Sequence, residues 1–174
     1  MKEMARYGLI LGLICVIASG LLAGINALTK GKILAQDEAE EKMSLEEVMP
    51  KAENFQPVKS GEDIIYYKAY DKEGKLLGAA FKASGKGYSS VIETMVGMDK
   101  EGLVNIIKIL NQNETPGLGA KVAEADFTSR FRHKKASDLK DVQAITGATI
   151  SSKAVIDSVK EKAKEIQELM KNER

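Results

Sequence analysis

A short segment near the end of the chain is crowded with hydroxyl groups. The sequence from position 146 to position 152 is TGATISS, with hydroxyls on Thr146, Thr149, Ser151 and Ser152. An amphipathic helical pattern follows at once, and a helix N-terminus offers unpaired N–H groups and partial positive charge to a phosphate. The small Gly147 and Ala148 would let the backbone approach such an anion, and Lys153 would add positive charge.

The same residues also suit a purely structural role. A Ser or Thr that precedes a helix accepts hydrogen bonds from backbone N–H groups and stabilises the helix by about 1 kcal/mol. The segment has neither the GxxxxGK(S/T) nor the GxGxxG pattern, so a free nucleotide is not specifically indicated. No base that could activate a hydroxyl for nucleophilic catalysis is evident nearby. We therefore expect either a helix cap or a hydroxyl that another enzyme modifies, and no catalytic residue.

Composition narrows the chemistry further. The chain has one cysteine, Cys15, and one histidine, His133, so a structural zinc site, an iron–sulfur cluster or an internal disulfide would lack ligands or partners. His133 lies in the basic run RFRHKK, which predicts a solvated surface histidine. Lys and Arg number 26 against 25 Asp and Glu, and this balance argues against a nucleic-acid partner. No metal site is expected.

The N-terminal region predicts a membrane anchor. No residue from Tyr7 to Thr29 is charged, and about 20 apolar residues are enough to cross a bilayer as a helix. The apolar region of a cleaved signal peptide is shorter, so we expect a retained single span. Glycines four residues apart suit close packing against other helices, although membrane helices also tolerate glycine without such a role. These glycines are Gly8, Gly12, Gly20 and Gly24.

The remaining sequence predicts an α+β domain with an antiparallel sheet. Four strand patterns joined by short turns cover residues 64–70, 75–83, 91–99 and 103–110. A helix that starts in the TGATISS segment is expected to bury one apolar face on the sheet. That face consists of Val155, Val159, Ala163, Ile166 and Met170. The expected organisation is a tail (1–6), the transmembrane helix (7–29), a linker or stalk helix (30–60) and the folded domain (61–174).

These motifs together resemble one known family. The TGAT segment, the upstream segment ETPGLGAK and the single N-terminal span are similar, in the same order, to the FMN-binding domain family. That family includes the G subunit of the Rnf complex and the C subunit of sodium-translocating NADH:quinone reductase. The resemblance implies that the last Thr of the motif, Thr149, carries FMN covalently as a phosphoester.

The resemblance also implies further cofactor-binding residues. Around the attachment site they are Thr146, Gly147, Ala148, Ser151, Ser152 and Lys153, and in the loop near the flavin they are Glu114, Thr115, Pro116, Gly117, Leu118 and Gly119. One position departs from the family signature, since Gln143 stands where an Asp is usual, three residues before the motif.

The implied function is electron transfer within a membrane complex. The resemblance and the length of 174 residues favour the G subunit of an ion-translocating ferredoxin:NAD oxidoreductase. The expected partners are the other membrane subunits and a flavin transferase, with the soluble domain on the outer face of the cell membrane. Two alternatives stay open at this point: a C-type subunit of the quinone reductase, and a membrane-tethered binding module without flavin.

Overall fold

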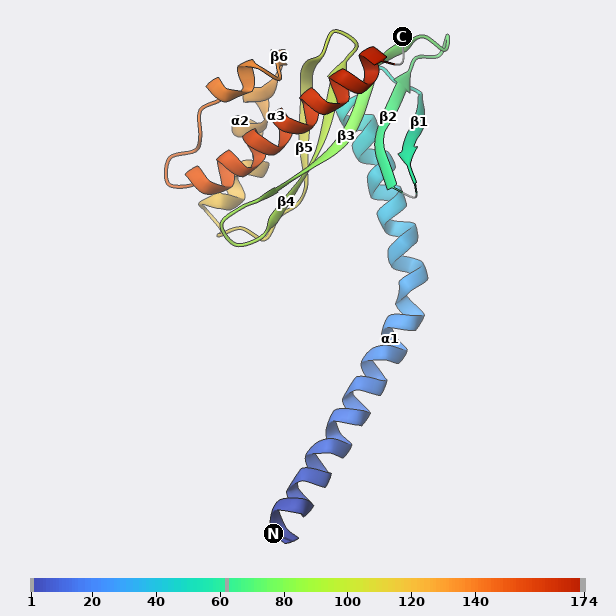
Figure 1. The fold of residues 1–174 in the computed structure, drawn as a ribbon, viewed down its shortest axis with the longest axis vertical. Coiled ribbons are helices and arrows are strands. Elements are labelled where there is room, and N and C mark those ends of the chain that lie inside the picture. The colour runs from blue at the N-terminus through green and yellow to red at the C-terminus, as the bar shows by residue number, and fades with distance from the viewer. Residues whose placement is uncertain (1, 62, 173–174) are drawn as a thin grey trace. The chain divides into compact units, whose positions relative to one another are not determined.

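The computed structural model describes residues 2–61 and 63–172, and the chain divides into two compact units (Figure 1). The first unit, Met1–Glu41, is formed by most of one long helix, α1 (Lys2–Val48). The second unit, Lys42–Arg174, contains the last turns of α1 and every other element. Any functional site built from several elements therefore lies in the second unit.

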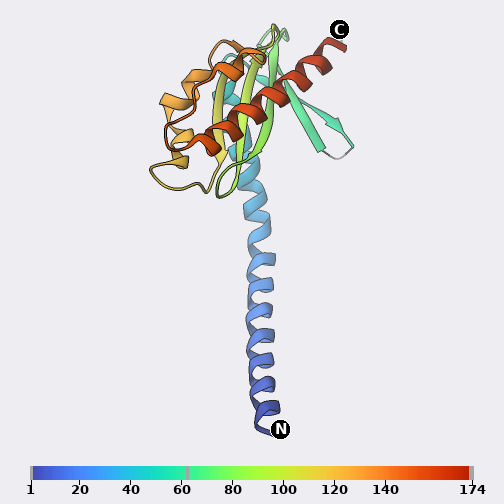
Figure 2. The same cartoon turned by 60° about the vertical axis from the view of Figure 1, so that its left-hand side comes forward.

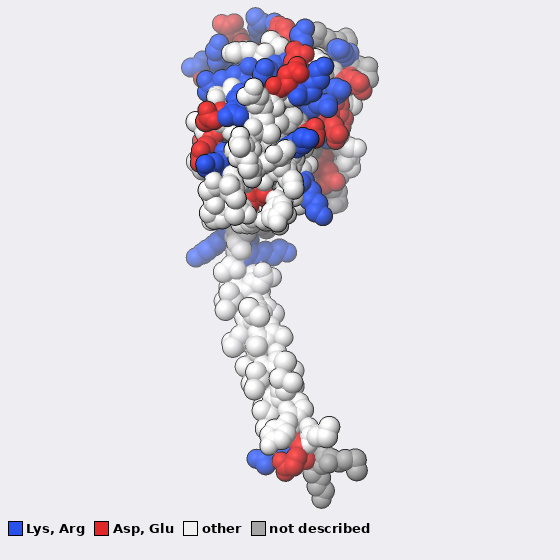
Figure 3. Space-filling view, turned by 90° about the vertical axis from the view of Figure 1, so that its left-hand side faces the viewer, with Lys and Arg blue, Asp and Glu red and all other residues white. Residues whose placement is uncertain are grey.

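Helix α1 includes a segment that is long and apolar enough to span a membrane. Its large apolar side chains are exposed, as expected where lipid would surround them. Figure 3 shows this part of the helix free of Lys, Arg, Asp and Glu, whereas both signs of charge cover the second unit. A Cβ atom added at Gly12 or Gly20 would meet no atom within 4 Å, so these positions leave the helix surface open.

The four predicted strands form the centre of an antiparallel sheet. They are β2 (Asp63–Tyr70), β3 (Leu76–Lys86), β4 (Val91–Asp99) and β5 (Leu103–Asn111). The spatial order follows the chain from β1 to β6, and each neighbouring pair is antiparallel. The expected α+β fold with an antiparallel meander is confirmed.

Two of the turns have the same sequence and the same hydrogen-bond pattern. The sequence DKEG occurs at 71–74 and again at 99–102. Each time, the Oδ1 atom of the aspartate accepts hydrogen bonds from the N–H groups two and four residues later, at 2.9–3.0 Å. The glycine that ends each motif has a positive φ, 77° at Gly74 and 84° at Gly102, which residues with a side chain rarely adopt. These turns fix the register of β2 with β3 and of β4 with β5.

Two strands at the edges of the sheet were not predicted. We expected a stalk over residues 30–60, but Asn54–Ser60 form β1, which pairs with β2. The proline within it, Pro57, is compatible with a strand at the edge of a sheet. The two-residue β6 (Lys134–Lys135) closes the opposite edge against β5.

Helix α3 (Thr149–Asn172) crosses one face of the sheet (Figure 2). The apolar face predicted for it is confirmed: four of its five residues are buried and Met170 is half-buried. At Gly85 in β3 the helix comes so close that an added Cβ would lie 2.3 Å from the carbonyl oxygen of Ala154. Helix and strand therefore meet backbone to backbone at this point.

The end of α1 covers the opposite face. Leu45, Val48 and Met49 are buried there against residues of β2, β3 and β4. A Cβ added at Gly97 in β4 would lie 2.2 Å from the carbonyl oxygen of Val48. The centre of the sheet is thus covered on both faces, and each helix approaches it closely at a glycine.

Short helices fill the connection between β5 and α3. They are η1 (Gly119–Ala123), α2 (Ala125–Thr128), η2 (Ser129–Phe131) and η3 (Asp138–Asp141). The first of them, η1, begins at the last residue of the ETPGLG segment. In the basic run RFRHKK, His133 is exposed as expected, while Phe131 of the same run and Leu139 beyond it are fully buried and anchor the segment.

Candidate functional site

A cavity of about 500 Å³ lies where the ETPGLG segment meets the first turn of α3. Eight of the residues that the sequence suggested for a cofactor line it: Glu114, Thr115, Leu118, Gly119, Gly147, Ala148, Thr149 and Ser151. The two segments are some thirty positions apart in the chain, and η1 packs against α3 to bring them together.

Some suggested residues are not among those that line the cavity, and two that do line it were missed. Thr146, Pro116, Gly117, Ser152 and Lys153 are outside the lining set. Tyr88, from the link between β3 and β4, and Ile150, from the first turn of α3, line it without having been suggested. Tyr88 could have been suspected because it is an aromatic residue in a glycine-bearing link. The sequence does not show, however, that this link faces the cavity.

The first turn of α3 faces the cavity with unused donors. The first helical hydrogen bond runs from the N–H of Ser152 to the carbonyl of Ala148, at 2.9 Å. Within the described part of the chain, no acceptor is present for the N–H groups of Thr149, Ile150 and Ser151. The hydroxyl of Thr149 is exposed and likewise has no partner among the described residues. Three N–H groups and one hydroxyl without a partner among the described residues thus belong to residues that line the cavity.

The hydroxyl groups of the TGATISS segment do not cap the helix. Ser151 Oγ donates to Glu114 Oε2 at 2.5 Å, and Ser152 Oγ accepts from the N–H of Ile145 at 3.0 Å. The residue just before the helix is Ala148, which has no side-chain acceptor. Helix capping by these hydroxyls, the alternative role considered for the segment, therefore does not account for its free donors.

Glu114 is the buried charge of the site, with only 5% of its surface exposed. Besides the Ser151 hydroxyl, it accepts hydrogen bonds from the N–H groups of Tyr88, Ser89 and Ser90 at 2.9–3.0 Å. Burial by itself raises the pKa of Glu114, but these donors lower it more, and the net pKa is about 2. The carboxylate is therefore ionised at neutral pH and already satisfied by the protein.

The loop before the helix is held at two points. Gly147 has a φ of 81°, which turns the chain sharply just before α3 begins. Upstream, Arg130 Nη1 donates to the backbone carbonyl of Gln143 at 2.9 Å, and the same guanidinium pairs with Asp126. At Gln143 the contact therefore uses the backbone, which any residue at this position would supply.

Apolar side chains surround the mouth of the cavity. Tyr88, Leu118 and Ile150 are 71%, 49% and 56% exposed. Large apolar residues left in water on several different segments around one hollow are typical of a binding surface. A ligand with a flat, partly apolar body would cover them.

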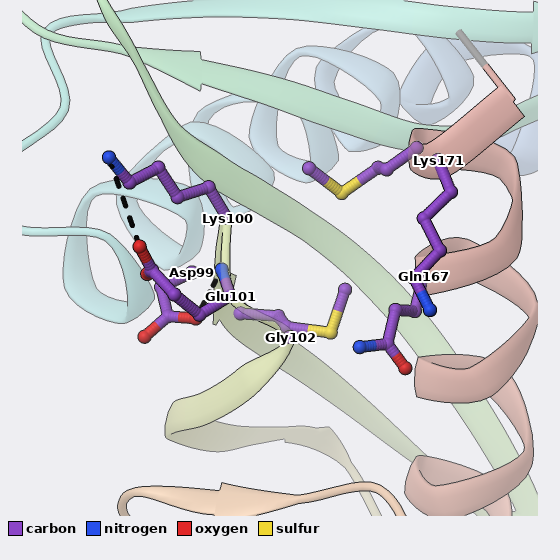
Figure 4. Close-up of a pocket in the computed structure, with 8 residues that line it drawn as sticks. Asp99, Lys100, Glu101, Gly102, Gln167 and Lys171 are labelled. Atoms are coloured by element: carbon purple, nitrogen blue, oxygen red, sulfur yellow. Dashed lines mark hydrogen bonds and ion pairs between the residues drawn. The ribbon is translucent and has the colours of Figure 1, made fainter. Parts of the chain in front are cut away.

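Two other cavities of similar volume lie elsewhere in the second unit. One of about 520 Å³ is formed by the β4–β5 turn and the end of α3 (Figure 4). There Asp99 is engaged by its own turn, and Lys100 pairs with Glu101 at 3.8 Å. The other, of about 530 Å³, adjoins Pro50 and His133. Neither contains a residue that the sequence suggested for a cofactor.

The candidate site offers few side chains that could take part in a reaction. Among the residues lining it, Glu114 is the one with a charged side chain, and its oxygens are occupied. No group of His, Cys, Asp or Glu side chains suited to a metal ion occurs among the described residues. The arrangement can hold an anion at the helix N-terminus and present a hydroxyl to it.

Comparison with known proteins agrees with this geometry. Residues 87–164 match the FMN-binding domain family, and residues 1–48 match the RnfG N-terminal region. The first match spans every segment that lines the cavity.

Relatives with similarity over most of their length include two complex subunits. The chain is 32% identical over 162 residues to the G subunit of the proton-translocating ferredoxin:NAD(+) oxidoreductase complex of Clostridium ljungdahlii, covering 87% of this chain and 85% of that protein. It is 32% identical over 197 residues to the G subunit of the Na(+)-translocating ferredoxin:NAD(+) oxidoreductase complex of Acetobacterium woodii, covering 98% and 95%. Among solved structures, Shewanella oneidensis NqrC matches with a TM-score of 0.49 and 19% identity over 70% of this chain and 74% of that one.

Proposed function

The chain belongs to the family of G subunits of ion-translocating oxidoreductase complexes, and from this premise we propose that it is the membrane-anchored electron-transfer subunit of an Rnf-type ferredoxin:NAD oxidoreductase. FMN, when bound, supplies the redox chemistry, while the protein positions it. The observation that carries the proposal is the free hydroxyl of Thr149, beside free N–H groups at the mouth of the cavity.

The residues of the cavity fit FMN. The phosphate would lie at the N-terminus of α3, where unpaired N–H groups and the helix dipole favour an anion. The apolar part of the ring system would cover Tyr88, Leu118 and Ile150, which are otherwise exposed. The absence of a side chain at Gly119 keeps the wall of the cavity close to Ser151 and Glu114.

We further propose that the cofactor is attached covalently to Thr149. The bond would join Thr149 Oγ1 to the phosphorus of the flavin, while a phosphoanhydride bond in an activated flavin nucleotide breaks. The nucleoside monophosphate leaves and the hydroxyl proton passes to solvent, so the adduct equals threonine plus FMN minus one water. Among the described residues that line the cavity, Glu114 is the one carboxylate, and it does not serve as a base because it accepts hydrogen bonds on both oxygens and has a pKa of about 2. A separate flavin transferase therefore makes the bond, and the exposed hydroxyl is within its reach.

The proposed setting is a single-pass anchor in the cell membrane, with the flavin domain on the outer face. Covalent attachment suits that location, because a dissociated flavin would be lost to the surroundings. Electrons would be exchanged with cofactors of the other membrane subunits. A C-type subunit of the quinone reductase would carry the same cofactor with different partners, so the subunits that co-purify distinguish the two.

A pair of variants tests the assignment. Thr149→Val removes the free hydroxyl while keeping the shape, and Thr146→Val removes an exposed hydroxyl three positions away in the same loop. With a flavin transferase co-expressed, the wild type and Thr146→Val should show flavin absorbance after denaturing gel filtration. Thr149→Val should not. Flavin that stays bound to denatured Thr149→Val would refute the attachment site.

A further inference from the structure

The carboxylate of Glu114 joins three segments that are far apart in the chain. It belongs to the ETPGLG segment, its Oε1 accepts from the N–H groups of Ser89 and Ser90, and its Oε2 accepts from the Ser151 hydroxyl. The partners lie 24–37 positions away along the chain. The contacts thus connect the β3–β4 link, the loop after β5 and the first turn of α3.

The packing around this carboxylate leaves little room for movement. A Cβ added at Gly87 would lie 2.6 Å from Glu114 Oε1, and one added at Gly119 would lie 2.6 Å from Ser151 Oγ. Ser90 Oγ also accepts from the N–H of Asn113 at 2.8 Å, which ties the same link to the residue before Glu114. Backbone therefore encloses the carboxylate on both sides.

These contacts determine which hydroxyl is free. Ser151 is 2% exposed and its hydroxyl proton is donated to Glu114, so its side chain points inward. Thr149 lies two residues earlier in the same turn, and a two-residue step rotates a helix by more than half a turn, so its side chain points outward. Holding Ser151 inward fixes the rotation of the turn and, with it, the direction of the Thr149 hydroxyl.

We propose that Glu114 is a positioning residue: through Ser151 it fixes the first turn of α3 so that the Thr149 hydroxyl faces the mouth of the cavity. The side chains of Glu114 and Ser151 are thereby assigned to holding the turn, while the free N–H of Ser151 stays available to the ligand. The inference deepens the proposed function and rests on it for the identity of the ligand, but not for the geometry of the turn.

A carboxylate is the group suited to this task. It accepts hydrogen bonds on both oxygens, and here every neighbour within bonding distance is a donor. An amide of the same shape has one acceptor oxygen and directs N–H groups at the donors on its other side. Glu114→Gln therefore preserves volume but breaks the contact with either Ser151 or the β3–β4 link.

The chain offers a matched control in Asp99. Its carboxylate also accepts hydrogen bonds from two backbone N–H groups and one side chain, but in the β4–β5 turn, and it does not line the cavity. Asp99→Asn thus weakens a carboxylate-held loop of the same kind at another site. Any effect that both variants share reflects general stability rather than positioning.

The experiment compares the full-length wild type with Glu114→Gln, Ser151→Ala and Asp99→Asn in detergent. Amide hydrogen exchange is followed by mass spectrometry in flavin-free protein, and visible circular dichroism in flavin-loaded protein. Exchange of the hydrogen-bonded amides in segments 87–92 and 145–152 should quicken about ten-fold in Glu114→Gln and Ser151→Ala, as expected when a buried partner is lost. In the second segment these amides are those of Ile145, Ala148 and Ser152. The dichroism of the bound flavin should change in both, because its attachment point has moved, and Asp99→Asn should leave both properties unchanged.

The exchange measurement decides the positioning role without depending on the flavin. Unchanged exchange at 145–152 in both Glu114→Gln and Ser151→Ala would overturn the proposal. Faster exchange with wild-type dichroism in Ser151→Ala would also overturn it, because Glu114 would then serve stability alone. A wild type that never acquires flavin, but shows the expected exchange pattern, would place the failure in the proposed function and not in the geometry.

Discussion

At the residue scale, Glu114 keeps its negative charge well below the pH at which an ordinary glutamate is protonated. Its pKa is about 2 in the folded protein against a reference value of 4.5. The folded state therefore binds this proton less readily than the unfolded chain does. The stabilisation is fully present above pH 4.5 and is lost as the pH falls towards 2.

Glu114→Gln should remove this pH dependence. We expect the variant to unfold more readily than the wild type at neutral pH, by about 1–3 kcal/mol, because buried donors lose their partner. The difference should shrink as the pH falls below the reference value. Denaturant titrations of both proteins at several pH values measure it, and curves that stay parallel down to the lowest pH would show that Glu114 contributes no such linkage.

Two glycines of the ETPGLG segment should respond differently to substitution by alanine. At Gly119 an added Cβ would lie 2.6 Å from Ser151 Oγ and 2.9 Å from Glu114 Cβ, both of which are buried and constrained. At Gly117 the space is open, but φ is 76°. We expect Gly119→Ala to alter flavin loading and the flavin spectrum, and Gly117→Ala to lower stability by about 1–2 kcal/mol with a normal spectrum. Equal spectra in the two variants would contradict the packing described for Gly119.

The sequence predicted part of the site. Residue type and position before a helix drew attention to the hydroxyls of the TGATISS segment, and the family resemblance singled out Thr149 and added the ETPGLG segment. The roles of Glu114 and Ser151 were not predictable, because they depend on contacts between residues up to 37 positions apart. For the same reason Tyr88 was missed: its position at the cavity follows from the N–H groups of its link bonding to Glu114.

At the scale of elements, α3 can position the site only if it lies directly on the sheet. The helix lies very close to the sheet at Gly85, where an added Cβ would be 2.3 Å from the backbone of Ala154. Gly85→Ala should push the helix away and lower the free energy of unfolding by about 1–3 kcal/mol. Gly31→Ala, in an open position on α1, is the control. Thermal unfolding of both variants measures this, and an unchanged midpoint in Gly85→Ala would contradict the close contact.

The strands of the meander were predictable for a local reason. β2 to β5 each carry an apolar run bounded by a glycine-bearing turn, and the two DKEG turns contain their own hydrogen-bond acceptor and their own positive-φ residue. β1 was missed because its sequence, NFQPVKS, is polar and contains a proline. It forms because β2 offers it an edge with which to pair.

At the scale of the whole molecule, the anchor should do more than hold the protein in the membrane. The glycines of α1 leave an open surface where a second helix could approach closely. Gly12→Leu and Gly20→Leu should therefore weaken co-purification with the other membrane subunits, while flavin loading of the second unit persists. Quantitative pull-down from membranes measures both, and unchanged recovery in the two variants would show that the glycines are incidental to assembly.

The most direct test of the central claim is a peptide mass. Trypsin cleavage after Lys140 and Lys153 releases the peptide DVQAITGATISSK, which contains every hydroxyl of the TGATISS segment. From a host with flavin transferase, this peptide should carry the added mass of one FMN minus one water, and fragment ions should place it on Thr149. An unmodified peptide, or a flavin located on any other residue, would contradict the account.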